Sequence, residues 1–310
     1  MAEILQRVWT EMPGQVRRSW DILRLDRLHP SVNGNKPFKL HGYLSHALDA
    51  GFKGILTFGG PYSNHIHASA HAAHSVGLKS IGIIRGERPD RLSPTLSDAE
   101  SQGMELRFMD RGHYRAFADA CTRDGHSDQC PAYLPIPEGG AGFMGMEGAA
   151  LIHRWIPKGH YDAILCACGT GTTMAGLAKG AEKGQRIVGV SVLKGYMKLE
   201  SDVRGMAGPI PEGVDLDFIH EHHYGGYAKA DGGLTDFMNG FHDRHGIPSD
   251  FVYTGKLFHA AEDLMRKGCF RAQERILCIH SGGLQGNRSL PEGTLRFDCG
   301  HGPIFAALNP

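Results

Sequence analysis

The sequence has no excess of either charge and no long apolar run. Its 310 residues include 33 Lys+Arg and 33 Asp+Glu, so there is no positive field to attract nucleic acid or an anionic membrane. Apolar runs such as Gly54–Phe58 and Ile81–Ile84 are far shorter than the roughly 20 residues that a membrane-spanning helix needs. Residues 1–9 carry Glu3 and Arg7 and lack the apolar core of an export signal. We therefore expect a globular protein without a nucleic-acid or membrane partner.

Cysteine is scarce as well, with 7 in the chain, an odd number. A chain of this length buries a sizeable core without disulfides, so the cysteines indicate a reducing, cytoplasmic setting. Cys166 and Cys168 are one residue apart, which is not the spacing of a zinc pair, and we interpret them as core-facing thiols on a strand. Three histidines share one face of an expected helix without a carboxylate or cysteine close by in sequence, namely His67, His71 and His74. We therefore predict no metal site.

Apolar runs and helical stretches alternate along the chain, which is typical of an α/β protein with parallel sheets. We expect strands at 54–58, 81–84, 106–108, 163–168, 187–192, 251–253 and 276–279. We expect helices at 63–76, at 93–101, from the turn after 168 to Lys179, and at 256–266. Proline and glycine gather at 135–142, between two α/β blocks. These patterns predict two open, mostly parallel α/β lobes with a ligand in the cleft between them, the larger lobe formed by 1–48 plus 150–310 and the smaller by 49–149.

Two segments combine polar side chains with the start of an expected helix. Lys36 and Lys39 are three residues apart, so both project from nearly one face, although surface lysines at a helix start show the same pattern. The run Gly59–His65 places Ser63 and Asn64 after a strand and a glycine turn, where the unpaired N–H groups of a helix N-terminus bind anions. A simple N-cap at Ser63 or Asn64 explains the same residues equally well.

A glycine–threonine loop follows the expected strand at 163–168. Its backbone amides and hydroxyls can hold a phosphate dianion, although it has neither a Walker ending nor the GxGxxG spacing. A helix cap explains one threonine but not the whole run, so we interpret the loop as a phosphate site formed by Gly169, Thr170, Gly171, Thr172 and Thr173. Two further polar segments, Tyr253–Lys256 and His280–Gly286, each follow an expected strand, and catalytic groups of α/β proteins lie at such strand ends.

Together these segments call for a ligand with a phosphate, a carbonyl that a lysine can capture and a polar ring. Pyridoxal 5′-phosphate meets all three requirements. The joint occurrence of the segments in this order is far more specific than any one of them. We therefore predict pyridoxal 5′-phosphate as the cofactor.

The same segments resemble the 1-aminocyclopropane-1-carboxylate deaminase / D-cysteine desulfhydrase family, which belongs to the tryptophan-synthase-β-like, fold type II pyridoxal-phosphate enzymes. The resemblance runs from about Leu23 to Gly286, and the tail 287–310 matches no part of the family. It implies that Lys36 is the Schiff-base lysine and that Lys39 reaches the cofactor phosphate. It also implies a phosphate cup at Gly169–Thr173.

The resemblance further assigns residues around the cofactor ring and the substrate. Asn64 bonds the phenolic oxygen of the ring, and Ser281 faces the pyridine nitrogen. Ser63, Asn64 and His65 lie where the substrate carboxylate docks, with His65 in place of the glutamine of the family. Tyr253 lies over the substrate side of the ring, with Tyr227 as its companion. The catalytic residues implied are Lys36, Ser63, Tyr253 and Tyr227.

Two positions separate the branches of this family. The deaminase branch has a glutamate after the tyrosine that aligns with Tyr253 and no hydroxyl residue at position 281, whereas this chain has Thr254 and Ser281. A neutral hydroxyl leaves the pyridine nitrogen largely unprotonated, and the weaker electron sink suits the loss of a good leaving group such as thiolate. We therefore expect β-elimination from a small amino acid in a homodimeric enzyme, with D-cysteine giving pyruvate, sulfide and ammonia. The alternatives are deamination of 1-aminocyclopropane-1-carboxylate to 2-oxobutanoate and ammonia, dehydration of a hydroxyamino acid, and a non-catalytic relative that only binds the cofactor.

Overall fold

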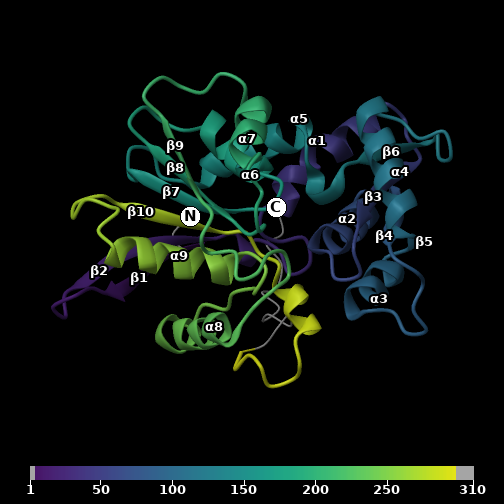
Figure 1. Cartoon of the computed structure of the whole chain (residues 1–310). Coiled ribbons are helices and arrows are strands. Elements are labelled where there is room, and N and C mark those ends of the chain that lie inside the picture. Colours follow the sequence, from purple (N-terminus) through teal and green to yellow (C-terminus); the bar gives the residue numbers. More distant parts are fainter. Residues whose placement is uncertain (1–3, 298–310) are drawn as a thin grey trace.

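Two separate sheets organise the chain, and they stand side by side in Figure 1. The computed structural model describes residues 4–297; the expectations for residues 1–3, for Cys299 and for the end of the tail lie outside this range. The larger sheet has six strands in the order β1-β2-β10-β7-β8-β9, and the smaller has four in the order β5-β4-β3-β6. The strands are β1 (Leu5–Glu11), β2 (Arg17–Arg24), β3 (Gly54–Gly59), β4 (Lys79–Arg85), β5 (Met104–Met109), β6 (Tyr133–Ile136), β7 (Ala163–Cys168), β8 (Arg186–Ser191), β9 (Asp215–Ile219) and β10 (Ile276–His280).

Helices connect most of these strands. The α-helices are α1 (Lys36–Asp49), α2 (Asn64–Ser75), α3 (Pro94–Ser101), α4 (Arg111–Asp124), α5 (Phe143–Ala150), α6 (Thr172–Lys179), α7 (Leu199–Ala207), α8 (Gly232–His245) and α9 (Thr254–Arg266). Short 3₁₀ helices are η2 (Leu25–Arg27), η3 (Glu138–Gly140), η4 (Leu151–Trp155) and η5 (Leu284–Ser289). In residues 4–297, no helix is both long and apolar enough to span a membrane.

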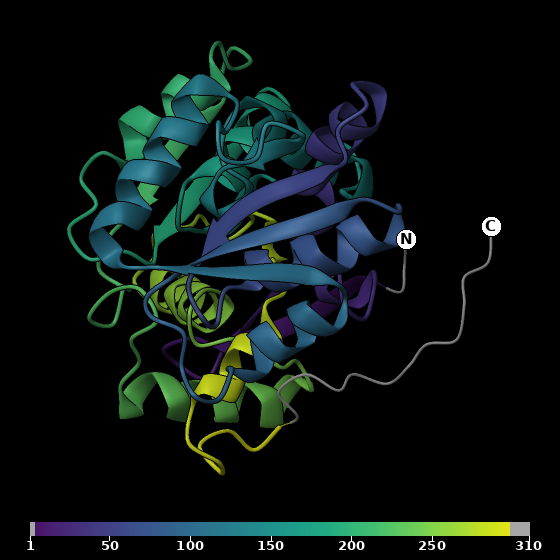
Figure 2. The same cartoon turned by 90° about the vertical axis from the view of Figure 1, so that its right-hand side faces the viewer.

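All strand pairs of the smaller sheet are parallel. Figure 2 shows α4 on one side of this sheet and α2 with α3 on the other. Phe58 and Tyr114 belong to the core beneath α4, whereas Ile66 and Leu96 belong to the core on the α2 side. Burial on both faces explains why β3 and β4 read as continuous apolar runs in the sequence.

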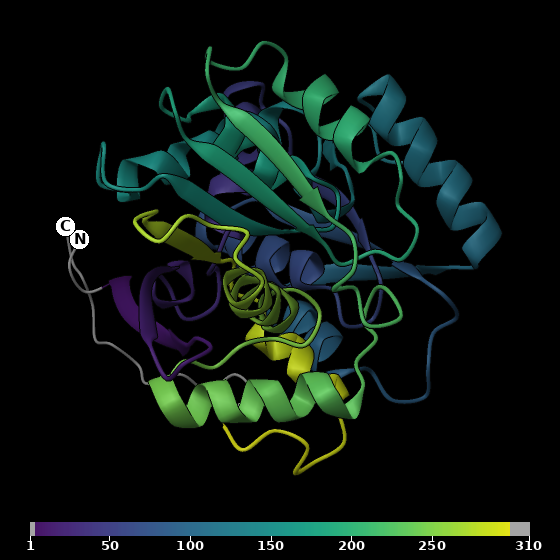
Figure 3. The same ribbon diagram turned by 60° about the vertical axis from the view of Figure 1, so that its left-hand side comes forward.

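The larger sheet begins with an antiparallel hairpin, β1–β2, and its other strand pairs are parallel. Helix α9 packs on β7 and β10, and α8 packs on α9 farther from the sheet, as Figure 3 shows. Cys166 and Cys168 are buried in the core of this sheet with free thiols, which confirms the interpretation of core-facing cysteines.

The two-lobe α/β class is confirmed, whereas the proposed domain boundaries stay a prediction. The strands of the small sheet all lie between 54 and 136.

The strand expected at 251–253 was wrong, because this segment is a turn that leads into α9. The carboxylate of Asp250 accepts hydrogen bonds from the backbone N–H groups of Val252, Tyr253 and Thr254. These N–H groups are therefore not available to a β-ladder. In this turn the carboxylate of Asp250 satisfies the backbone donors that the carbonyls of a neighbouring strand would satisfy in a sheet.

Candidate active site

The segment before α1 brings three of the predicted site positions together. Lys36 is the first residue of α1, and its Nζ donates to Oδ1 of Asn35 at 2.8 Å. The Asn35 Nδ2 donates to Oγ1 of Thr173 at 2.9 Å, and the Asn35 N–H donates to the carbonyl of Ser281 at 3.2 Å. Gly34 is left-handed with φ 68°, and a Cβ there would lie 1.9 Å from the Ser281 carbonyl oxygen. Asn35 thus joins the lysine, the threonine loop and the turn after β10.

Both predicted lysines lie in protein surroundings that disfavour positive charge. Burial lowers the pKa of Lys36 to about 8, although the nearby charge of Asp250 acts to raise it. Lys39 is only 4 % exposed, and burial followed by the charge of Lys36 lowers its pKa well below the ordinary value. The site therefore holds two amines whose charged forms are disfavoured, and an incoming anion would stabilise the charged form of either one.

The glycine–threonine loop connects β7 to α6. Gly171 is the N-cap of α6 in the left-handed conformation at φ 77°, and no side chain caps the helix. The first N–H groups of α6 therefore lack an intrahelical partner, which is the arrangement that binds phosphate. The hydroxyls of Thr170 and Thr172 are 2.9 Å apart, and Thr173 accepts from Asn35, so its own hydroxyl proton is left to donate. The loop has donors where a phosphate dianion needs them.

The run Ser63–His65 lies at the start of α2. Ser63 is the N-cap, and its Oγ accepts from the N–H of Ile66 at 3.3 Å. The Asn64 Oδ1 accepts from Nε2 of Gln285 at 2.5 Å, so the amide of Asn64 reaches the turn after β10. Gly283 in that turn packs so closely that a Cβ there would lie 2.2 Å from Nδ2 of Asn64. Ser63 is therefore the N-cap of α2. The assignment of Ser63, Asn64 and His65 to the substrate carboxylate stays a prediction.

His65 is 3 % exposed and is held by the small sheet. Its Nε2 lies 2.7 Å from Oγ1 of Thr57, and that hydroxyl donates to the carbonyl of Ile136 at 3.0 Å. Because a hydroxyl has one proton, Nε2 is the donor to Thr57, and Nδ1 carries the lone pair. Burial and the charges of Lys36 and Lys39 lower the pKa of His65 well below its usual value, so the ring is neutral.

The two predicted tyrosines face each other. The rings of Tyr227 and Tyr253 are 6.2 Å apart at 72°, and a Cβ on Gly169 would lie 3.3 Å from the Tyr253 ring. Tyr253 is therefore next to the phosphate loop. Burial, followed by the neighbouring Tyr227, raises the pKa of Tyr253 well above the ordinary value. Its phenol stays protonated at neutral pH and can serve as a proton donor.

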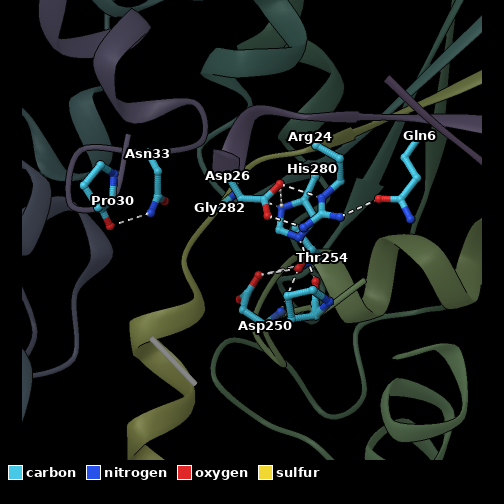
Figure 4. A network of polar contacts seen from close by, with 10 residues as sticks. Gln6, Arg24, Asp26, Pro30, Asn33, Asp250, Thr254, His280 and Gly282 are labelled. Carbon is cyan, nitrogen blue, oxygen red and sulfur yellow. Dashed lines mark hydrogen bonds and ion pairs between the residues drawn. The ribbon is translucent and has the colours of Figure 1, made fainter. Parts of the chain in front are cut away.

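A buried polar network supports the turn after β10 (Figure 4). The Nε2 of His280 donates to the carbonyl of Pro248 at 2.8 Å and its Nδ1 accepts from the Gly282 N–H at 3.2 Å, which is the pattern of a neutral ring. The Thr254 hydroxyl accepts from the Asp250 N–H at 2.7 Å and donates to Oδ1 of Asp250 at 2.8 Å. The single proton of the Thr254 hydroxyl is thus committed to Asp250. Ser281 is a hydroxyl residue next to Asn35, since its carbonyl accepts the Asn35 N–H.

The chemistry of these donors fits pyridoxal phosphate. The chain provides an amine of lowered pKa, an uncapped helix N-terminus with threonine hydroxyls, and neutral polar groups beside both. Sequence analysis assigned no role to three residues that join these parts: Asn35, Asp250 and Gln285. Asn35 and Gln285 lie inside the polar segments, and an aspartate such as Asp250 is a turn signal because its side chain can accept a hydrogen bond from the backbone two residues on.

Comparisons with known proteins agree with this geometry. The model of the family described as pyridoxal-phosphate dependent enzyme matches residues 22–282. A putative 1-aminocyclopropane-1-carboxylate deaminase of Pyrococcus horikoshii is 30 % identical in an alignment of 283 positions, and the match covers 86 % of this chain and 84 % of that protein. The mitochondrial bifunctional D-cysteine desulfhydrase/1-aminocyclopropane-1-carboxylate deaminase of Arabidopsis thaliana is 27 % identical in an alignment of 291 positions, and the match covers 86 % of this chain and 72 % of that protein. The crystal structure of an ACC deaminase homologue superposes with a TM-score of 0.71 at 29 % identity, covering 87 % of this chain and 86 % of the other.

The fold and the comparisons together define the class of this protein. The chain belongs to the pyridoxal-phosphate dependent enzymes, and its two mostly parallel α/β sheets are those of fold type II. Within that class it is a member of the group that contains the 1-aminocyclopropane-1-carboxylate deaminases and D-cysteine desulfhydrases. The predicted cofactor and the resemblance stated from the sequence are thereby confirmed.

Proposed function

We propose that this enzyme is a β-elimination lyase for a small amino acid, with D-cysteine as the substrate. In this reaction D-cysteine and water give pyruvate, hydrogen sulfide and ammonia. The observation that carries the proposal is the pair of neutral hydroxyl residues, Thr254 and Ser281, at the two positions where the deaminase branch differs. Since Thr254 is committed to Asp250, Ser281 is the group we assign to the pyridine nitrogen.

Each predicted site residue has a role in this proposal. When bound, pyridoxal phosphate supplies an electron-withdrawing ring that stabilises negative charge at the substrate α-carbon. Lys36, with a pKa of about 8, holds the cofactor at rest and removes the α-proton as a free amine during the reaction. Lys39 and the loop Gly169–Thr173 hold the phosphate. Asn64 orients the ring.

The substrate end of the site is formed by α2 and the two tyrosines. The backbone N–H groups at the start of α2, together with Ser63, Asn64 and His65, bind the substrate carboxylate. Tyr253 stays protonated because burial raises its pKa, so it or Tyr227 can give a proton to the departing sulfide. The Tyr253 phenol lies beside Gly169, so this proton donor is next to the loop that we assign to the cofactor phosphate, and the Tyr227 ring lies 6.2 Å from the Tyr253 ring.

The names of the relatives favour a second candidate, deamination of 1-aminocyclopropane-1-carboxylate to 2-oxobutanoate and ammonia. The two reactions are separated by their products. Purified enzyme loaded with cofactor is offered D-cysteine, L-cysteine and the cyclopropane acid, and sulfide, pyruvate and 2-oxobutanoate are measured. We expect equal amounts of sulfide and pyruvate from D-cysteine. Faster release of 2-oxobutanoate would establish the second candidate instead, and no turnover of any of the three would refute both.

Lys36→Ala is the matched test of the mechanism, with Lys158→Met, an exposed lysine in a turn, as the control. The first change should abolish turnover, and the second should leave it unchanged.

We also propose a cytoplasmic location and a homodimer. The six free cysteines of residues 4–297 support a reducing location, and size-exclusion chromatography with light scattering measures the oligomeric state.

A further inference from the structure

Helix α9 carries a polar stripe that faces one loop. Lys256, His259 and Asp263 follow one another at spacings of three and four residues, so they share one face of the helix. The loop that they contact is formed by residues 222–228, here called the tyrosine loop because it carries Tyr227. His222 Nε2 lies 3.0 Å from Oδ2 of Asp263, and the Tyr224 hydroxyl bonds Nδ1 of His259.

Lys256 makes the innermost of these contacts. Its side chain is 0 % exposed, and its Nζ donates to the carbonyls of His223 at 2.9 Å and Gly226 at 2.8 Å. A fully buried amine is costly unless its protons are hydrogen-bonded, so the two carbonyls account for a lysine at this position. The same carbonyls accept the N–H group of Gly226 in the loop at 3.0 Å and that of Lys229, directly after the loop, at 3.2 Å. Lys256 therefore binds the turn at the two acceptors that define it.

The backbone of the tyrosine loop needs such support. Tyr224 and Ala228 are non-glycine residues with φ 51°, and Gly225 and Gly226 between them have φ 87° and 121°. Left-handed non-glycine residues persist only where their surroundings fix them. The hydrogen bonds to α9 fix this loop from outside, together with the packing of Tyr224 on the buried cluster that includes Leu234 and Met238.

Tyr227 depends on this conformation for its place in the site. It is 45 % exposed, and its ring lies 6.2 Å from the ring of Tyr253, which is itself the N-cap residue of α9. We propose that Lys256 is a positioning residue: it binds the tyrosine loop to α9 and thereby sets Tyr227 opposite Tyr253. The inference rests on the proposed function only where it assigns Tyr227 a part in catalysis.

Hydrogen–deuterium exchange tests the positioning itself, without any turnover. In Lys256→Met the helix keeps an apolar side chain of similar length, but the two carbonyls lose their buried donor. We expect the amides of Gly226 and Lys229 to exchange on the order of tenfold faster than in the wild type. Trypsin should also cleave sooner after Lys229, which is exposed. Lys158→Met is the control and should change neither rate, whereas unchanged rates in Lys256→Met would overturn the proposal.

A double-mutant cycle tests the consequence for catalysis. Lys256→Met should lower kcat on the order of tenfold in the wild-type background, and much less in Tyr227→Phe, because the two changes act through one group. Equal losses in both backgrounds would show that Lys256 does not act through Tyr227. If no amino acid is turned over, the proposed function fails while the exchange result still decides the positioning. Should Lys256→Met not fold, Tyr224→Phe loosens the same loop at His259, and unaltered exchange in that variant would contradict the inference.

Discussion

The lowered pKa of Lys36 can be measured on the cofactor-free protein. An amine with a pKa of about 8 is about 9 % neutral at pH 7, whereas an ordinary lysine with a pKa of about 10.4 is about 0.04 % neutral. Lys36 should therefore carry about 200 times more neutral amine than a free lysine at that pH. The side chain is partly exposed, so a small acylating reagent can reach it.

Trace acetylation with isotopic acetic anhydride between pH 6 and 10 provides the assay, read at Lys36 by peptide mass spectrometry. Only the neutral amine reacts, so labelling should rise with pH and level off above a midpoint near 8. A soluble lysine derivative in the same tube provides the ordinary titration near pH 10. The midpoint is the decisive quantity, because the intrinsic nucleophilicity of an amine also falls with its pKa. A midpoint near that of the free derivative would refute the reasoning that burial outweighs the charge of Asp250.

Three further predictions concern the loops that join the site. Asn35→Ala removes the bonds to the lysine amine and to Thr173 and should weaken cofactor binding about tenfold, as measured by fluorescence titration; unchanged affinity would contradict the bridging role. Thr173→Val should weaken binding of pyridoxal phosphate but not of pyridoxal, and equal losses for both would argue against a phosphate contact. Gly34→Ala places a Cβ 1.9 Å from the carbonyl oxygen of Ser281 and should lower the free energy of unfolding by about 3 kcal/mol or more in urea titrations. Gly159→Ala, at φ 62° in open space, is its control and should cost only about 1 kcal/mol; similar losses in the two variants would show that the close contact is not strained.

Most of the strands that were predicted from the sequence are buried on both faces, although β5 is largely half-buried and was predicted as well. β3, β4, β7 and β10 read as continuous apolar runs because helices cover both sides of their sheets. β9, which is largely half-buried and carries two aspartates, gave no such signal. The hairpin β1–β2 was missed for a related reason, since charged residues interrupt its apolar positions.

The site residues could be predicted where the sequence signal is local, but the contacts between distant segments could not. Residues of the polar segments could be picked out because each segment has its own local pattern, such as the lysine pair or the glycine–threonine loop. The contacts between segments could not, because Asn35 and Thr173 are 138 residues apart in the chain and Asn64 and Gln285 are 221 apart. Tyr253 was expected at the end of a strand and instead lies in a turn held by the Asp250 carboxylate, which the pattern of apolar residues does not predict.

The proposed mechanism depends on the amine of Lys36, which we expect to hold the cofactor. Enzyme loaded with pyridoxal phosphate is reduced with borohydride, digested with a protease, and analysed by mass spectrometry to find the lysine that carries the phosphopyridoxyl group. We expect the modification on Lys36 alone. Modification of Lys39 or Lys256 instead, or a protein that retains no cofactor after reduction, would contradict it.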